Sequence, residues 1–294
     1  MSTRRDWLKS ATVLGSGVAL AAFAGGTASA DDAASKLVNH RIKQSVCHWC
    51  FNPMSVAELA AAAAKIGLKS VELIEPKDWP TLKEHGLTCA IAGSHGFAKG
   101  FAHKDEWDFC YDKLKKSIDA SADFGCPTVI TFSGFRRGMD FDEATKNMID
   151  GLKGIVGYAE EKKITLCLEM LNSRVPVEMK GHPDYFCDHI DHSVEIVKKV
   201  GSPRLTVLFD IYHVQIMDGD VISRIRQHKD HIGHYHTAGN PGRNEIDRDQ
   251  EINYAPIMEE IVKTGYKGFV GQEFIPTAKD KIASLVAAAK LCDV

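Results

Sequence analysis

The chain has 294 residues, of which 36 are Lys or Arg and 39 are Asp or Glu, so its formal net charge is −3. This acidic balance argues against nucleic acid and anionic membranes as partners, because both attract strongly basic surfaces. The length suits one domain with a sizeable core, and no composition shift marks a linker between domains.

The first thirty residues have the features of an export signal. A charged start precedes an apolar centre from Val13 to Ala24 and a small-residue end at Ala28-Ser29-Ala30. Ser2-Thr3-Arg4-Arg5-Asp6-Trp7-Leu8-Lys9 is similar to the twin-arginine pattern. A membrane anchor is the alternative, but the apolar run is shorter than the roughly 20 residues of a span. We predict a twin-arginine signal peptide at residues 1–30, a periplasmic location and no stable membrane anchor after cleavage.

Residues 31–294 alternate strand and helix patterns with short connections. The expected strands cover residues 42–47, 70–74, 87–92, 128–132, 165–169, 205–210, 232–236 and 268–273. The expected helices cover residues 55–66, 79–84, 105–124, 142–162, 188–200, 221–227, 255–263 and 279–291. Eight strand–helix units favour an α/β fold, a single (β/α)₈ TIM barrel, over an open doubly wound sheet.

The chain has eight cysteines, and several lie inside apolar strand or helix patterns. This placement favours small buried thiols over a disulfide framework. Cys47-His48-Trp49-Cys50 has C-x-x-C spacing, but no second pair follows at zinc-site spacing. A metal or redox role therefore stays open, and packing at the first strand is the simpler interpretation.

Four of the expected strands end in a side chain that can bind a metal: Glu169, Asp210, His236 and Glu273. In a TIM barrel the carboxyl ends of all strands meet at one face, where active sites gather. A buried carboxylate needs a partner, and one bound cation can serve several of them. Three carboxylates and one imidazole suit Mn²⁺ or Mg²⁺, with Co²⁺ as a third choice, better than structural zinc.

The loop after the third strand, residues 93–103, is polar and rich in glycine. On the catalytic face such a loop could close over a substrate and exclude water, which makes His95 a candidate substrate-binding residue. A mobile surface loop without a function is the alternative.

Several segments are similar to the hydroxypyruvate isomerase family, and the resemblance covers essentially the whole chain after residue 30. They are Leu166-Cys167-Leu168-Glu169-Met170-Leu171-Asn172, Phe209-Asp210-Ile211-Tyr212-His213, Gly233-His234-Tyr235-His236 with Pro241-Gly242-Arg243, Glu251-Ile252-Asn253-Tyr254, and Gly271-Gln272-Glu273-Phe274. This family belongs to the xylose-isomerase-like barrel superfamily, which also holds the ketose 3-epimerases. The resemblance implies that Glu169, Asp210, His236 and Glu273 bind the metal. It also implies that Glu169 and Glu273 transfer protons, and that His213 and Arg243 hold substrate oxygens.

The implied activity is a metal-dependent isomerisation of a small α-hydroxy carbonyl compound through an enediolate, with hydroxypyruvate converted to tartronate semialdehyde. Two features point to different members of the superfamily. His236 is epimerase-like, because hydroxypyruvate isomerases tend to have Gln there, whereas Pro241-Gly242-Arg243 is isomerase-like. A ketose 3-epimerase therefore stays open as the alternative.

Two further classes of function are alternatives. A noncatalytic periplasmic sugar-acid-binding protein would not require the pair of proton-transferring glutamates. Phosphodiester cleavage, as in relatives of endonuclease IV, uses an Asp-x-His after the seventh strand, and none follows His236. The sequence leaves the oligomeric state, including a homo-oligomer, undecided.

Overall fold

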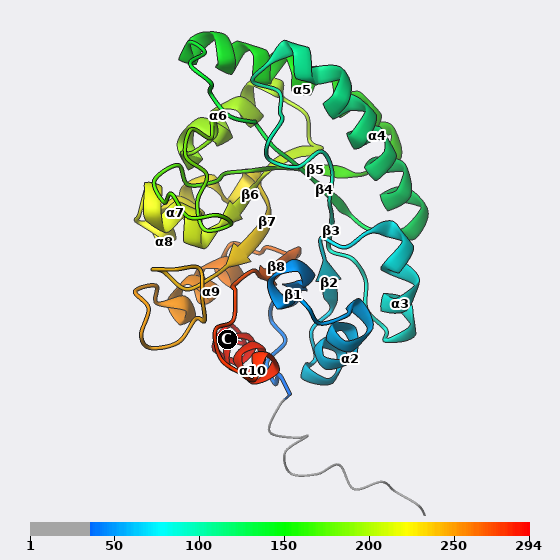
Figure 1. The fold of residues 1–294 in the computed structure, drawn as a ribbon, viewed down its shortest axis with the longest axis vertical. Helices are drawn as coiled ribbons and strands as arrows, with labels where there is room; N and C mark the ends of the chain where they lie inside the picture. The colour runs from blue at the N-terminus through cyan, green and yellow to red at the C-terminus, as the bar shows by residue number, and fades with distance from the viewer. Residues whose placement is uncertain (1–35) are drawn as a thin grey trace, which may run out of the picture.

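A computed structural model describes residues 36–294 of the chain, so the predicted export signal lies outside the described residues. Eight strands form the centre of the molecule, and helices surround them (Figure 1). Every pairing between strands is parallel. Within residues 36–294, no helix combines the length and apolar character that crossing a membrane requires.

The sheet has the strand order β2-β1-β8-β7-β6-β5-β4-β3. Its strands are β1 (Lys43–Cys47), β2 (Ser70–Glu72), β3 (Ile91–Ala92), β4 (Thr128–Thr131), β5 (Thr165–Glu169), β6 (Leu205–Asp210), β7 (Ile232–Thr237) and β8 (Phe269–Gln272). The seam between β2 and β3 is joined by one parallel bridge, Ser70 with Thr88, and by the bond from Leu73 N–H to the Ile91 carbonyl (3.1 Å). The predicted α/β TIM barrel is therefore present, as a nearly closed barrel.

The third strand is shorter than predicted, because side chains replace its ladder hydrogen bonds. The backbone N–H of Ala90 donates to the hydroxyl of Ser70 at 2.7 Å, and the carbonyl of Ala90 accepts from the hydroxyl of Thr128 at 2.7 Å. The predicted strand over residues 87–92 keeps only Ile91 and Ala92 as regular strand.

The helices lie outside the barrel and follow the predicted order. They are α2 (Val56–Ile66), α3 (Trp79–Glu84), α4 (Trp107–Phe124), α5 (Phe141–Lys162), α6 (Ile190–Val200), α7 (Ile211–Met217), α8 (Val221–His228), α9 (Tyr254–Lys263) and α10 (Lys281–Leu291). Short 3₁₀ turns are η1 (His48–Phe51), η2 (Pro76–Asp78), η3 (Lys104–Glu106) and η4 (Lys229–His231). A capping box at Ser55 and Glu58 opens α2. Helix α7 was not predicted, because its apolar residues continue directly from β6.

One continuous core joins the strands to the inner faces of the helices. On α2, for example, Leu59, Ala63 and Ile66 are buried at helical spacing. All eight cysteines lie in the described part of the chain, where they are buried and free. The prediction of buried thiols is confirmed.

Candidate active site

The four predicted metal ligands meet at the carboxyl ends of neighbouring strands. One ligand atom from each of Glu169, Asp210, His236 and Glu273 lies within 4.8 Å of all the others. Asp210 and His236 are register partners on β6 and β7, which are hydrogen-bonded neighbours. Glu169 ends β5, and Glu273 directly follows β8. The closure of the barrel thus brings together residues that are more than a hundred positions apart.

A cavity of about 250 Å³ opens beside this cluster. Glu169, Glu273 and Arg243 line it, whereas Asp210 and His236 are fully buried. The rest of its wall is mainly apolar and aromatic, formed by Trp49, Leu73, Gly93, Ser94, Gly96, Phe97, Ile130, Phe132, Leu171, Met179 and His182. Two of the three acids therefore face the space that a small substrate would enter.

Arg243 is the cation at the centre of the site. Its Nη2 lies 3.1 Å from Oδ2 of Asp210 and 2.5 Å from Oε2 of Glu273, and its Nη1 donates to the carbonyl of Met179 at 2.8 Å. Only 2 % of its surface is exposed, so both of these ion pairs are buried. Its guanidinium carbon lies 5.2 Å from the ring of Trp49.

The three clustered carboxyl groups differ in acidity. Burial, with the nearby charge of Glu273, raises the pKa of Glu169 to about 7, and His236 opposes this shift. Burial also raises the pKa of Asp210 to about 6, against the effect of Arg243. Burial acts in the same direction on Glu273, but Arg243 and His236 outweigh it and hold the pKa of Glu273 well below its usual range. Burial therefore outweighs the nearby cations at Glu169 and Asp210, but not at Glu273.

The two carboxylate oxygens of Asp210 have different partners, one in a helix cap and the other in the site. Oδ1 accepts from the backbone N–H of Tyr212 at 2.8 Å and so caps α7. Oδ2 faces Arg243 and lies 3.5 Å from Nε2 of His213. Nδ1 of His213 accepts from the backbone N–H of Asn172 at 3.0 Å, so the proton of the neutral ring is on Nε2. Nε2 has no hydrogen-bond partner among the described residues, which leaves a buried donor in the site.

His95, the third predicted substrate-binding residue, is tied to the protein at both ring nitrogens. Nε2 lies 2.9 Å from the hydroxyl of Thr131, and Nδ1 lies 3.0 Å from the carbonyl of Lys99. The neighbouring residues Gly96 and Phe97 line the cavity. His95 thus fixes the cavity wall to β4, and its direct contact with substrate stays a prediction.

Three residues near the site were not predicted. Trp49 donates its indole N–H to Oε1 of Glu273 at 3.0 Å. His182 lines the cavity, with its ring centroid 4.4 Å from that of Phe97. Glu72, at the end of β2, lies 2.8 Å from Nε2 of His236. The signal for Glu72 in the sequence was weaker, because the predicted strand over residues 70–74 places it inside the strand, whereas β2 ends at it.

The donor set fits a divalent cation. It offers three carboxylates and the Nδ1 of His236, which has no hydrogen-bond partner among the described residues and lies 2.8 Å from Oε2 of Glu273. Burial raises the pKa of two of the carboxyl groups, those of Glu169 and Asp210, and a divalent ion would favour the charged form of both. Oxygen-rich sites of this kind suit Mn²⁺ or Mg²⁺.

Comparison with known proteins gives a family and several relatives. The family model described as "Xylose isomerase-like TIM barrel" matches residues 60–289. A human protein provisionally named hydroxypyruvate isomerase is 29 % identical over 74 % of each chain. The 2-oxo-tetronate isomerase of Cupriavidus necator is 29 % identical over 78 % of this chain and 90 % of its own.

Solved structures of the same fold carry different names. A Brucella melitensis protein named as a family 2 AP endonuclease has a TM-score of 0.75 and 27 % identity, and the match covers 84 % of this chain and 98 % of that one. A D-psicose 3-epimerase of Clostridium cellulolyticum has a TM-score of 0.70 and 17 % identity, over 85 % of this chain and 97 % of that one. The epimerase match is evidence for the fold alone.

Proposed function

The chain belongs to the xylose isomerase-like TIM barrel family, and from this premise we propose that it is a metal-dependent isomerase of short sugar acids, with hydroxypyruvate as substrate and tartronate semialdehyde as product. One observation carries the proposal. Of the four clustered residues, the two glutamates Glu169 and Glu273 line the cavity. Relatives named as hydroxypyruvate and 2-oxo-tetronate isomerases support the same class of enzyme.

Glu169, Asp210, His236 and Glu273 would hold the divalent ion, Mn²⁺ or Mg²⁺ with Co²⁺ as a third choice. When bound, this ion supplies Lewis-acid polarisation of the substrate carbonyl. Asp210 and His236 are fully buried and so serve as ligands only. Glu169 and Glu273 have cavity-facing oxygens and combine the ligand role with acid–base chemistry.

The two glutamates would perform the proton transfer. In hydroxypyruvate, one carboxylate takes a proton from the hydroxymethyl carbon, and the resulting enediolate receives a proton at the former carbonyl carbon. The hydroxyl proton moves from the first oxygen to the second, so that an aldehyde and a secondary alcohol result. No oxidant or reductant is required, because the electron pair stays within the substrate.

Arg243 and His213 would hold the substrate's oxygens. The guanidinium fork of Arg243 suits bidentate contact with a carboxylate, and Arg243 lines the cavity. Nε2 of His213 is a buried donor without a hydrogen-bond partner among the described residues. His213 is fully buried and is not among the residues that line the cavity, so its contact with substrate stays a prediction. The mainly apolar wall on the other side excludes water from the enediolate.

A ketose 3-epimerase is the second candidate function. Return of the proton to the opposite face of the same carbon would give epimerisation, and two glutamates across one substrate allow either outcome. His236 at the seventh-strand position favours this candidate. Arg243 favours a substrate with a carboxylate, which a free ketose lacks.

The deciding experiment follows solvent deuterium into substrate. Hydroxypyruvate, tartronate semialdehyde and free ketoses are incubated with the protein and Mn²⁺ in D₂O, and the ion is removed before NMR spectra are recorded. Exchange into the sugar acids supports the isomerase, and exchange only into ketoses supports the epimerase. A noncatalytic sugar-acid-binding protein would exchange none of them, which would refute both. Glu260→Gln, which changes an ion pair between helices α8 and α9, is the active control.

A further inference from the structure

Glu72 lies beneath the proposed metal site and contacts three side chains through one oxygen. Its Oε1 lies 2.8 Å from Nε2 of His236, 3.1 Å from Nε2 of His234 and 3.4 Å from Sγ of Cys47. All four residues are buried in the barrel, with at most 1 % of their surface exposed. Nothing in the proposed reaction uses Glu72.

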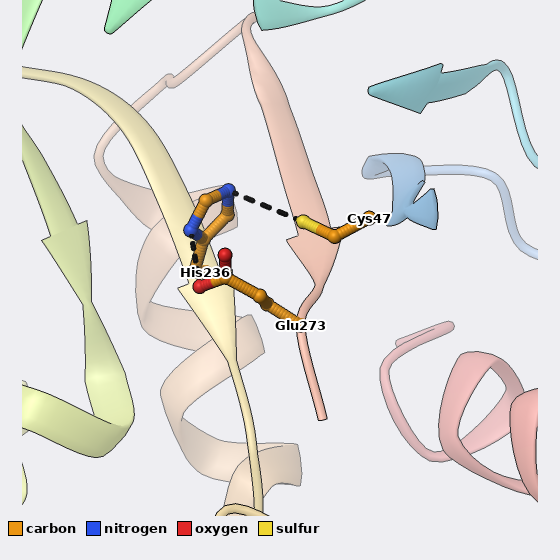
Figure 2. Close-up of side chains that lie close together, drawn as sticks. All are labelled: Cys47, His236 and Glu273. Carbon is orange, nitrogen blue, oxygen red and sulfur yellow. Dashed lines mark hydrogen bonds and ion pairs between the residues drawn. The ribbon is translucent and has the colours of Figure 1, made fainter. Parts of the chain in front are cut away.

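The ring of His236 separates Glu72 from the cluster of carboxylates. Nε2 faces Glu72 and also lies 3.7 Å from Sγ of Cys47, whereas Nδ1 lies 2.8 Å from Oε2 of Glu273. Figure 2 shows Cys47 and Glu273 at different nitrogens of the ring. The two nitrogens of one imidazole therefore face two different environments.

A neutral imidazole carries its proton on one nitrogen and offers a lone pair on the other. Without an ion, Nε2 and Nδ1 each lie 2.8 Å from a carboxylate oxygen, that of Glu72 and that of Glu273, and an ionised carboxylate only accepts hydrogen bonds, so both contacts suit a protonated nitrogen. An ion in the cluster of carboxylates needs the lone pair of Nδ1, so the proton that stays is the one on Nε2, facing Glu72. The lone pair of His236 is then on Nδ1, on the side of Glu273 and Glu169. Metal-bound histidines commonly donate their other ring N–H to a carboxylate in this way.

The fold leaves space for this contact at Gly271, the register partner of His236 on β8. A Cβ at Gly271 would lie 2.2 Å from Oε1 of Glu72 and 2.9 Å from Cδ2 of His236. Any larger residue at this position would therefore displace the carboxylate or the ring. The absence of a side chain at Gly271 therefore makes room for the contact between Glu72 and His236.

We propose that Glu72 is a positioning residue for the metal site: it holds the proton of His236 on Nε2 and thereby directs the Nδ1 lone pair at the metal. His234 and Cys47 fix the carboxylate in place by donating to the same oxygen. This inference rests on the metal site of the proposed function. It adds a residue that contacts neither metal nor substrate and yet sets the affinity for the ion.

The test is metal binding rather than turnover. Mn²⁺ is titrated calorimetrically into metal-free wild type, Glu72→Gln and Glu260→Gln. Glu260 is the matched control, because it is also a buried, paired glutamate, 2.7 Å from Arg226 in an ion pair between helices α9 and α8. Gln at position 72 keeps the shape, but its amide also donates and no longer selects one tautomer. We expect the Kd of Glu72→Gln to rise about 10- to 100-fold, with the control unchanged.

Three results would overturn the inference. Equal Kd values for Glu72→Gln and wild type would show that the tautomer needs no support from Glu72. Two ions in wild type and one in Glu72→Gln would make Glu72 a ligand of a second ion, held with His234 and His236. No binding by wild type would refute the proposed function itself, which keeps the two failures distinguishable.

A measurement on wild type decides the matter if Glu72→Gln does not fold. Two-bond ¹H–¹⁵N spectra of the Mg²⁺-loaded protein report which nitrogen of His236 carries the proton. The proposal requires the proton on Nε2. A proton on Nδ1 would overturn it, because the lone pair would then point at Glu72.

Discussion

The indole N–H of Trp49 donates to Oε1 of Glu273 across 3.0 Å, while Oε2 of the same carboxylate faces His236 and Arg243. Both oxygens of Glu273 thus have defined partners, and the side chain still lines the cavity. Asp210 has defined partners too, but it is fully buried. We therefore expect Glu273 to transfer protons as well as bind the metal, and Asp210 only to bind the metal.

We predict that Glu273→Gln and Asp210→Asn lose activity for different reasons. Gln at position 273 keeps an oxygen that can coordinate weakly but removes the basic carboxylate, so kcat should fall by roughly 10² to 10⁴. Asp210→Asn should mainly weaken metal binding. Turnover is measured at increasing Mn²⁺, and only Asp210→Asn should be partly rescued. Near wild-type turnover of Glu273→Gln at saturating Mn²⁺ would assign the proton transfer to another residue, with His213 first.

Metal removal should abolish activity and lower stability. We expect about one divalent ion per chain by metal analysis, no activity after dialysis against EDTA, and recovery on addition of Mn²⁺ or Mg²⁺. An ion at a hundredfold excess over its Kd stabilises the folded state by about 2.7 kcal/mol, so the melting temperature should rise with it. A metal-free preparation with full activity in EDTA would contradict this prediction.

The position of the loop of residues 93–103 at the cavity should depend on His95. His95→Ala removes the bonds to Thr131 and Lys99 and should loosen the wall that carries Phe97, so KM should rise or kcat fall several-fold. His192→Ala is the matched control, because His192 Nε2 also bonds one threonine hydroxyl, that of Thr145, at 3.0 Å. Unchanged steady-state kinetics of His95→Ala would show that the loop is not a functional lid.

His95 should also make stability depend on pH. Burial, partly opposed by the carbonyls of Lys99 and Gly96, lowers the pKa of His95 from 6.5 to about 4. Between these values the unfolded chain binds the proton and the folded chain does not, so stability falls as pH falls. The effect is on the order of a few kcal/mol once pH is below 4.

The measurement is the melting temperature of wild type and His95→Gln from pH 7 to pH 4. The raised pKa of Glu169 acts in the opposite direction in metal-free protein, so the difference between the two proteins is the informative quantity. Wild type should lose more stability than His95→Gln as the pH falls. Parallel curves would mean that His95 is not buried in its neutral form.

Export should require the two arginines of the predicted signal, which lies outside the described residues. Changing both Arg4 and Arg5 to Lys should leave the precursor in the cytoplasm, and the mature wild-type chain should begin at or near Asp31. Cell fractionation and N-terminal sequencing check both points. Normal export of the double variant would show that the signal was misread.

Local sequence patterns were enough to predict the alternation of eight strands and helices and the four residues at strand ends. Both depend on local patterns: hydrophobic periodicity marks each element, and the end of a strand marks the catalytic face. Glu169, Asp210, His236 and Glu273 could therefore be predicted as a cluster without coordinates, and one ligand atom from each lies within 4.8 Å of the others.

The different surroundings of these four residues, and hence their different roles, could be seen only in the tertiary structure. Glu72 and His236 are 164 positions apart and meet only because the barrel brings β2 and β7 to one interior. Which carboxylates line the cavity, and which nitrogen of His236 faces them, depends on neighbours from several strands. Burial and nearby charges from distant segments set the acidity of Glu169 and Glu273, and no local pattern in the chain encodes either quantity.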